Sequence, residues 1–145
     1  MAQLCTTVTA PTMAELRARR DAAAKTADLV ELRLDTVDGP ADILPGISVR
    51  PAPGHIKGLQ NVVVEDGGRK LLFLADLIPT ARHIQPAWVM GYDLDVVTCV
   101  NVRQQLLSEV TGTDTVLVFE HDPEIPSGTV AQDAKGRYVV TPVAV

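Results

Sequence analysis

The sequence predicts an α/β fold in which a βαβ unit precedes a mixed sheet with helices on one face. The first observation is a β-branched run, a capped helix and an alternating apolar run within residues 3 to 37. The second is a series of short β-rich runs after residue 46, separated by turns and one helical segment. With 145 residues and 46% apolar composition, the chain is long enough to bury an aliphatic core.

The opening segment has the pattern of a strand, a helix and a second strand. Residues 3–10 are rich in β-branched side chains. Thr12 and Glu15 have the spacing of a capping box, which predicts a helix over 13–25. In residues 28–37 apolar and charged side chains alternate with the period of two that a strand requires. Two strands joined through a helix predict a parallel pair with a right-handed crossover.

Residues 3–38 resemble the N-terminal strand, helix and strand of type I 3-dehydroquinate dehydratase, a (β/α)8-barrel lyase of the shikimate pathway. The most specific piece is Glu31-Leu32-Arg33. The resemblance implies that Glu31 and Arg33 contribute to substrate binding. The Schiff-base lysine and the histidine of that family come from later strands that have no counterpart here, so imine catalysis is not expected. The alternative is that the two residues are a charged pair with a structural role.

The remaining elements follow a junction rich in turn formers at residues 38–46. Short strands are expected over 47–51 and 61–65, and Asp66-Gly67-Gly68 supplies the turn into a strand over 70–74. Asn101 is expected to cap a helix that ends at Val110. The later expected elements are a strand over 115–120 and a hairpin formed by 129–133 and 137–143.

Three polar side chains mark the places where these strands end. His55 follows a Pro-Gly turn, Asp76 follows one apolar strand and His121 follows another. Imidazole nitrogen and carboxylate oxygen are ligands of zinc, and strand ends hold such ligands firmly. The sequence therefore predicts a metal site at these ends.

Residues 43–133 resemble the C-terminal half of a metallo-β-lactamase-fold hydrolase, through PGH, ADLIPT and FEHDPE in that order. The resemblance implies half of an αββα sandwich in residues 43–145, after a dehydratase-like fragment in 1–42. It also implies that His55 binds a first metal, His121 binds a second, and Asp76 bridges both as the catalytic carboxylate. A metal-activated water would then attack a carbonyl or phosphoryl centre.

The ligand set of that family is incomplete in this chain. Its H-x-H-x-D-H motif is absent, and the three histidines are His55, His83 and His121. Ala75 also replaces the glycine that commonly precedes the bridging aspartate. We therefore expect at most a weak mononuclear zinc site and a hydrolase relic that is weakly active or inactive. His83 is a candidate substitute ligand or substrate contact, and the alternative is a loop histidine with neither role.

Two other classes of function stay open. One is a dehydratase-like lyase fragment, and the other is a non-catalytic oligomerising module. Half of a two-sheet sandwich leaves an apolar sheet face uncovered, which the βαβ unit and a symmetric homodimer would cover. A small-molecule substrate is expected only if the chain is active.

Composition excludes several partners. A net charge of −5 gives no basic patch for nucleic acid. No stretch has the apolar length of a membrane span, and the start lacks the charged n-region of a signal peptide. Cys5 and Cys99 are isolated thiols without metal-site spacing, so we expect them to be reduced. These features predict a cytoplasmic protein that binds neither nucleic acid nor membrane.

Overall fold

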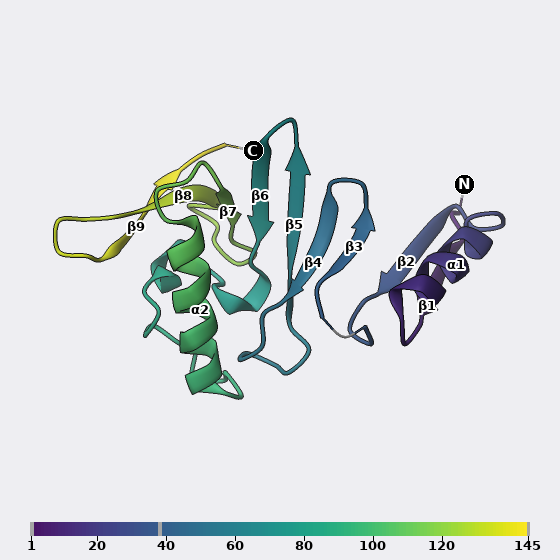
Figure 1. Ribbon diagram of the computed structural model, residues 1–145, viewed down its shortest axis with the longest axis horizontal. Coiled ribbons are helices and arrows are strands. Elements are labelled where there is room, and N and C mark those ends of the chain that lie inside the picture. Colours follow the sequence, from purple (N-terminus) through teal and green to yellow (C-terminus); the bar gives the residue numbers. More distant parts are fainter. Residues whose placement is uncertain (1, 38, 145) are drawn as a thin grey trace.

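The computed structural model describes residues 2–37 and 39–144, and divides their strands between two sheets (Figure 1). The small sheet contains β1 (Cys5–Thr9) and β2 (Leu29–Arg33), which are joined through helix α1 (Met13–Ala23). The large sheet contains seven strands in the order of the chain. These strands are β3 (Ala41–Leu44), β4 (Ile47–Pro51), β5 (Gln60–Asp66), β6 (Arg69–Phe73), β7 (Val116–Val118), β8 (Ser127–Gln132) and β9 (Tyr138–Pro142).

The N-terminal unit has the predicted βαβ arrangement. β1 and β2 pair in parallel, with Cys5 opposite Leu29 and Thr9 opposite Arg33. Thr12 caps α1, because its hydroxyl accepts a hydrogen bond of 3.3 Å from the backbone N–H of Glu15. The helix ends at Ala23, two residues before the predicted end. This unit has its own small core, formed by Val8, Ala10, Leu16 and Val37.

The large sheet is mixed, as predicted. Its neighbouring strands are antiparallel except β6 and β7, which are parallel. Parallel neighbours need a crossover, and here it contains the 3-10 helices η1 (Ala75–Leu77) and η2 (Ala81–Ile84) and the helix α2 (Val96–Val110). Leu106 and Leu107 of α2 belong to the same fully buried cluster as Leu72 of β6 and Leu117 of β7. The helix therefore covers one face of the sheet (Figure 1).

Two elements differ from the sequence prediction. Residues 41–44 form β3, although turn residues around them predicted a junction without a strand. Helix α2 begins at Val96 and not after Asn101, because the Asp95 side chain accepts a hydrogen bond of 3.0 Å from Thr98 N and caps the helix. Neither α-helix in the described ranges combines the length and the apolar character that crossing a membrane requires.

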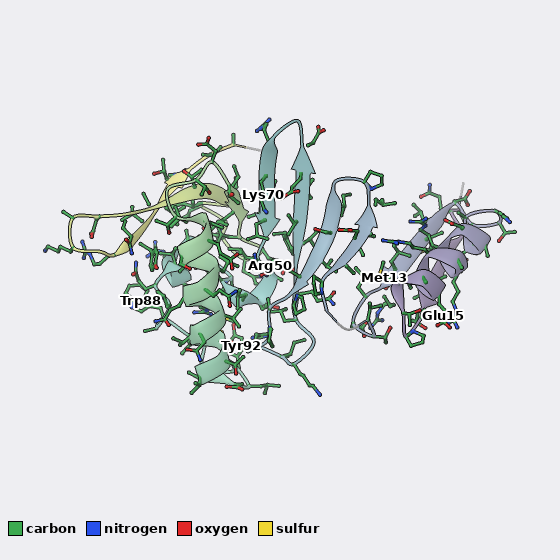
Figure 2. All side chains as sticks on the ribbon, in the orientation of Figure 1. Met13, Glu15, Arg50, Lys70, Trp88 and Tyr92 are labelled. Atoms are coloured by element: carbon green, nitrogen blue, oxygen red, sulfur yellow. The ribbon has the colours of Figure 1, made fainter. Side chains whose placement is uncertain are left out.

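The face of the large sheet opposite α2 is covered only in part. Near β3 and β4, the buried residues Ala41, Ile43 and Val49 pack against Met13 and Leu32 of the N-terminal unit. Figure 2 shows Met13 on the side of α1 that is turned towards β3. Farther along, a second group of apolar side chains on this face is only half-buried. This group, which we call the open face, comprises Val62, Val64, Leu71, Phe73 and Val118, and Val62 adjoins the first cluster.

Candidate metal centre

The parallel pair β6 and β7 places two of the predicted ligands at one edge of the sheet. Carboxyl ends of parallel neighbours meet at the same edge. Asp76 lies in η1, just after β6, and His121 lies in the turn after β7. A hydrogen bond of 3.0 Å from His121 N to Pro79 O joins the two segments. Both side chains are therefore held near one point, although 45 positions separate them in the sequence.

His55 reaches the same place from the loop between β4 and β5. Its neighbour Gly54 has φ +137°, and a Cβ atom there would lie 2.5 Å from the Cα atom of Cys99. Only glycine allows this close approach to α2. Two backbone hydrogen bonds then fix the loop, from Leu94 N to His55 O at 3.1 Å and from Asp95 N to Gly54 O at 2.9 Å. The Pro-Gly-His motif thus serves to pack His55 against the start of α2.

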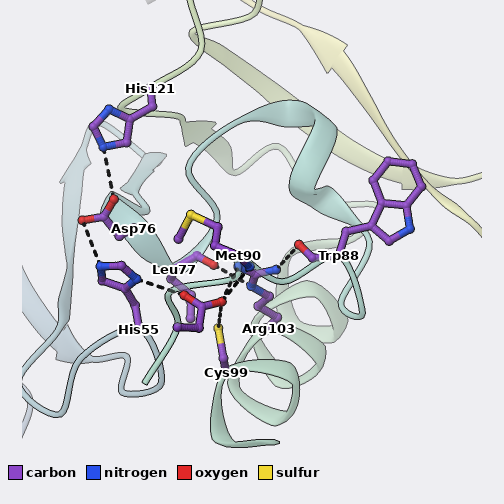
Figure 3. A network of polar contacts seen from close by, with 9 residues as sticks. His55, Asp76, Leu77, Trp88, Met90, Cys99, Arg103 and His121 are labelled. Carbon is purple, nitrogen blue, oxygen red and sulfur yellow. Dashed lines mark hydrogen bonds and ion pairs between the residues drawn. The ribbon is translucent and has the colours of Figure 1, made fainter. Parts of the chain in front are cut away.

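The structure brings the three predicted ligands together around one carboxylate. Asp76 Oδ1 lies 3.1 Å from His121 Nε2, and Asp76 Oδ2 lies 3.8 Å from His55 Nε2 (Figure 3). The backbone of Ala75 has φ +47°, in the left-handed region, and this turn sends the Asp76 side chain between the two rings. Glycine adopts this conformation without strain, whereas alanine at position 75 does not.

Asp93 orients His55, and sequence reasoning missed it. Its Oδ1 lies 2.9 Å from His55 Nδ1, and its side chain is 0% exposed. Burial would raise the pKa of Asp93, but hydrogen bonds from His55 and Met90 N and the charge of Arg103 outweigh burial and lower it. An ionised carboxylate only accepts hydrogen bonds, so His55 Nδ1 donates to Asp93, and this contact leaves Nε2 on the side of Asp76. Many metal-binding histidines are oriented in this way.

Glu120 is a second residue that sequence reasoning missed. Ligand atoms of Asp76, Glu120 and His121 lie within 4.8 Å of one another. His55 lies outside this group of three and approaches it through Asp76, at 3.8 Å. Glu120 directly precedes His121 and is exposed, so its carboxylate is free to turn towards a bound ion. Two imidazoles and two carboxylates make up a nitrogen and oxygen donor set that suits zinc.

The three predicted substrate-binding residues lie apart from this cluster. Glu31 accepts a hydrogen bond of 2.8 Å from Thr7, and Arg33 forms an ion pair of 3.2 Å with Asp35. Both belong to β2, which lies near the N-terminal end of the long axis and is separated from β7 by β3, β4, β5 and β6 (Figure 1). Among the described residues Glu31 and Arg33 each pair with another residue and not with each other, and their substrate role stays a prediction.

His83 lies in η2, where its Nδ1 is 2.7 Å from the hydroxyl of Thr80. Burial lowers the pKa of His83, and the positive charge of Arg103 lowers it further, against a smaller opposite effect of Asp93. The neutral ring is therefore favoured. Among the described residues, Asp76 forms ion pairs with His55 and His121 and none with His83, so we do not count His83 with the ligands.

A cavity of about 780 Å³ lies away from the ligands. It opens between η2, α2 and β9, and Ile84, Trp88 and Tyr138 contribute to its lining. Figure 2 shows Trp88 and Tyr92 on the two sides of α2. Tyr92 is the aromatic ring that meets the centre, because it packs edge-on against His55 with 5.8 Å between ring centroids.

Comparisons with known proteins give a structural likeness only. No protein-family model and no curated protein matches the sequence. A protein described as a probable metal-dependent hydrolase from Staphylococcus aureus has a TM-score of 0.64 at 21% identity, over 80% of this chain and 41% of that one. AidC, a dizinc quorum-quenching lactonase, has a TM-score of 0.65 at 23% identity, over 80% of this chain and 38% of that one. The hydrolase AbOPH of the beta lactamase superfamily has a TM-score of 0.64 at 16% identity, over 92% of this chain and 42% of that one.

These likenesses confirm the predicted fold class, part of a metallo-β-lactamase fold. The chain spans about two fifths of the length of these three proteins. Identities this low establish fold and leave activity open. The division after residue 42, the dehydratase-like fragment and the cytoplasmic location stay predictions.

Proposed function

We propose that this chain binds a single zinc ion through His55, Asp76 and His121, with Glu120 as a further ligand, and is a hydrolase relic with little or no turnover. One observation carries the proposal: each oxygen of the Asp76 carboxylate faces a different imidazole, at 3.1 and 3.8 Å. A zinc ion held by these groups would lower the pKa of water and polarise a carbonyl or phosphoryl group. The structural neighbours support the metal, since one of them is a dizinc lactonase.

Weak activity follows from the ligand count. Of the three histidines in these 145 residues, two approach Asp76, His55 at 3.8 Å and His121 at 3.1 Å. Two imidazoles with shared or exposed carboxylates suit one ion better than two. His121 and Glu120 are also exposed, so water screens the charges that would stabilise a transition state.

Zinc titration tests the binding step. Isothermal titration of the wild type should show one zinc per chain, and His55→Ala and Asp76→Ala should each weaken binding by roughly tenfold or more, because each removes a ligand. His83→Ala is the matched control, a histidine outside the cluster that should leave affinity unchanged. No zinc uptake, or uptake that is indifferent to the first two substitutions, would contradict the proposal.

Turnover tests the second half of the proposal. Zinc-loaded protein should hydrolyse an acyl-homoserine lactone with kcat/KM below about 10 M⁻¹s⁻¹, roughly a thousandfold under the ordinary enzyme range. The probe is chosen because AidC is a lactonase that was solved with N-hexanoyl-L-homoserine. Turnover at ordinary enzyme efficiency that Asp76→Ala abolishes would show that the centre is complete.

Self-association is a second candidate, favoured by the open face. Its five apolar side chains lie side by side on β5, β6 and β7 and are only half-buried. A symmetric homodimer would bury them, and two chains could pool their ligands. Sedimentation equilibrium should then show a dimer that Val64→Lys dissociates. A wild-type monomer would remove this candidate.

The lyase alternative depends on the N-terminal unit alone. Dehydroquinate turnover that Arg33→Ala abolishes would support it. The pairing of Arg33 with Asp35 at 3.2 Å favours a structural role instead.

A further inference from the structure

Arg103 is a buried charged side chain in the middle of an otherwise apolar helix face. Its residue is 0% exposed, and it lies between Cys99 and the pair Leu106 and Leu107 on the buried side of α2. A charge taken out of water needs partners, and an apolar residue of similar volume would usually serve the core equally well. Packing alone therefore does not explain this arginine.

The guanidinium contacts the supports of two proposed ligands. Its Nε donates a hydrogen bond of 2.6 Å to the carbonyl of Leu77, the residue directly after Asp76. Its Nη2 lies 3.8 Å from Oδ2 of Asp93, whose Oδ1 is bonded to His55 (Figure 3). One side chain on a rigid helix thus touches the segment that carries Asp76 and the carboxylate that orients His55.

The remaining contacts fix the guanidinium itself. Nη1 donates a hydrogen bond of 2.7 Å to Trp88 O, whereas Nη2 is buried without a hydrogen-bond partner. Asp93 Oδ2 also accepts a hydrogen bond from Met90 N at 2.9 Å. The planar fork of arginine bonds two carbonyls in different directions and still presents a charge to Asp93, which the single ammonium of lysine cannot do equally well.

We propose that Arg103 is a positioning residue that sets the distance between Asp76 and His55 and, through Asp93, the tautomer of His55. The inference rests on the proposed zinc site, since its consequence is zinc affinity. In the metal-free protein, Nδ1 of His55 is protonated because Asp93, held by Arg103, accepts its hydrogen bond.

The test compares Arg103→Met with Arg50→Met. Arg50 also joins the sheet to α2, through an ion pair of 2.7 Å with Glu109, but it contacts none of the four proposed ligands. We expect Arg103→Met to weaken zinc binding by roughly 10 to 100-fold, the usual effect of losing a partner that orients a metal ligand. Arg50→Met should change the affinity less than about twofold. Arg103→Lys should fall between the wild type and Arg103→Met.

A second readout does not depend on zinc. Nitrogen-15 NMR of the metal-free wild type should show His55 protonated at Nδ1, and Arg103→Met should populate the Nε2 tautomer. If Arg103→Met does not fold, Arg103→Lys carries the affinity readout, because it keeps the charge opposite Asp93 but cannot bond both Leu77 O and Trp88 O as the guanidinium does. Unchanged affinity and tautomer in a folded Arg103 variant, or equal weakening by Arg50→Met, would overturn the inference. Failure of the wild type to bind zinc would reject the proposed function, whereas the tautomer would still decide the role of Arg103.

Discussion

Ala75→Gly is expected to raise the free energy of unfolding, whereas an ordinary alanine-to-glycine change lowers it. Ala75 has φ +47°, and it is the one residue other than glycine with positive φ in the described ranges. For an L-residue this conformation costs about 1 to 2 kcal/mol, whereas glycine adopts it freely. Glycine should therefore relieve strain directly beside Asp76.

The magnitude follows from a comparison with Ala87→Gly. Ala87 is exposed and has negative φ, so this control should cost about 0.5 to 1 kcal/mol of stability through the greater freedom of the unfolded chain. That entropic cost is common to both changes. Ala75 is half-buried, so it also loses part of a methyl contact, roughly 0.4 kcal/mol. The free energy of unfolding of the Ala75→Gly protein should therefore be about 1 kcal/mol higher than that of the Ala87→Gly protein.

Urea unfolding followed by circular dichroism measures both variants. The urea concentrations at the unfolding midpoints of the two variants should differ, while the slope of free energy against urea stays the same. An unchanged slope indicates a change in stability and not in the denatured state. Ala75→Val should be less stable than the wild type, because a β-branched side chain fits the left-handed region worse than alanine does. Equal destabilisation by Ala75→Gly and Ala87→Gly would refute the reasoning.

Three further outcomes concern the rest of the fold. Leu117→Ala should lower the free energy of unfolding by about 2 to 5 kcal/mol in urea titrations, because Leu117 is 0% exposed within the main core; a loss under 1 kcal/mol would contradict that packing. Thr12→Ala should lower the free energy of unfolding by about 1 kcal/mol and reduce helical circular dichroism, with Ala18→Gly as a mid-helix comparison. Burial would raise the pKa of Asp122, but backbone N–H donors from three residues lower it, so its stabilisation is present above pH 3.8 and is lost as pH falls through its folded pKa. The free energy of unfolding, measured above and below that pH, should change less with pH in the Asp122→Asn protein than in the wild type. An equal pH dependence in the two proteins would exclude the effect.

The sequence predicted well the features that local patterns determine. From the strand ends, the Pro-Gly turn and the order of the motifs, we expected His55, Asp76 and His121 to lie together. In the structure both histidines lie beside Asp76. The hairpin around Gly67 and Gly68 also forms where its turn residues predicted it. Period and turn chemistry act within a few residues, so one sequence reveals them.

The features that it missed depend on distant partners. Asp93 lies among loop residues, and nothing near it in the sequence shows that it meets His55. Arg103 did leave a signal, because it interrupts the apolar positions 99, 106, 107 and 110 at helical spacing. The predicted start of α2 at Asn101 hid that signal, since it removed Cys99 from the helix. Asp95 was the correct cap, and starting there places Arg103 within the buried face.

The parallel pairing of β6 with β7 has a consequence for the order of folding. Their contact closes a long segment that contains η1, η2 and all of α2, and closing such a segment costs chain entropy before it gains contacts. The hairpin of β5 and β6 can form earlier, because it joins residues adjacent in sequence. We therefore expect Asp76 and His121 to meet late in folding. A metal ion that bound there would slow unfolding more than it would speed folding.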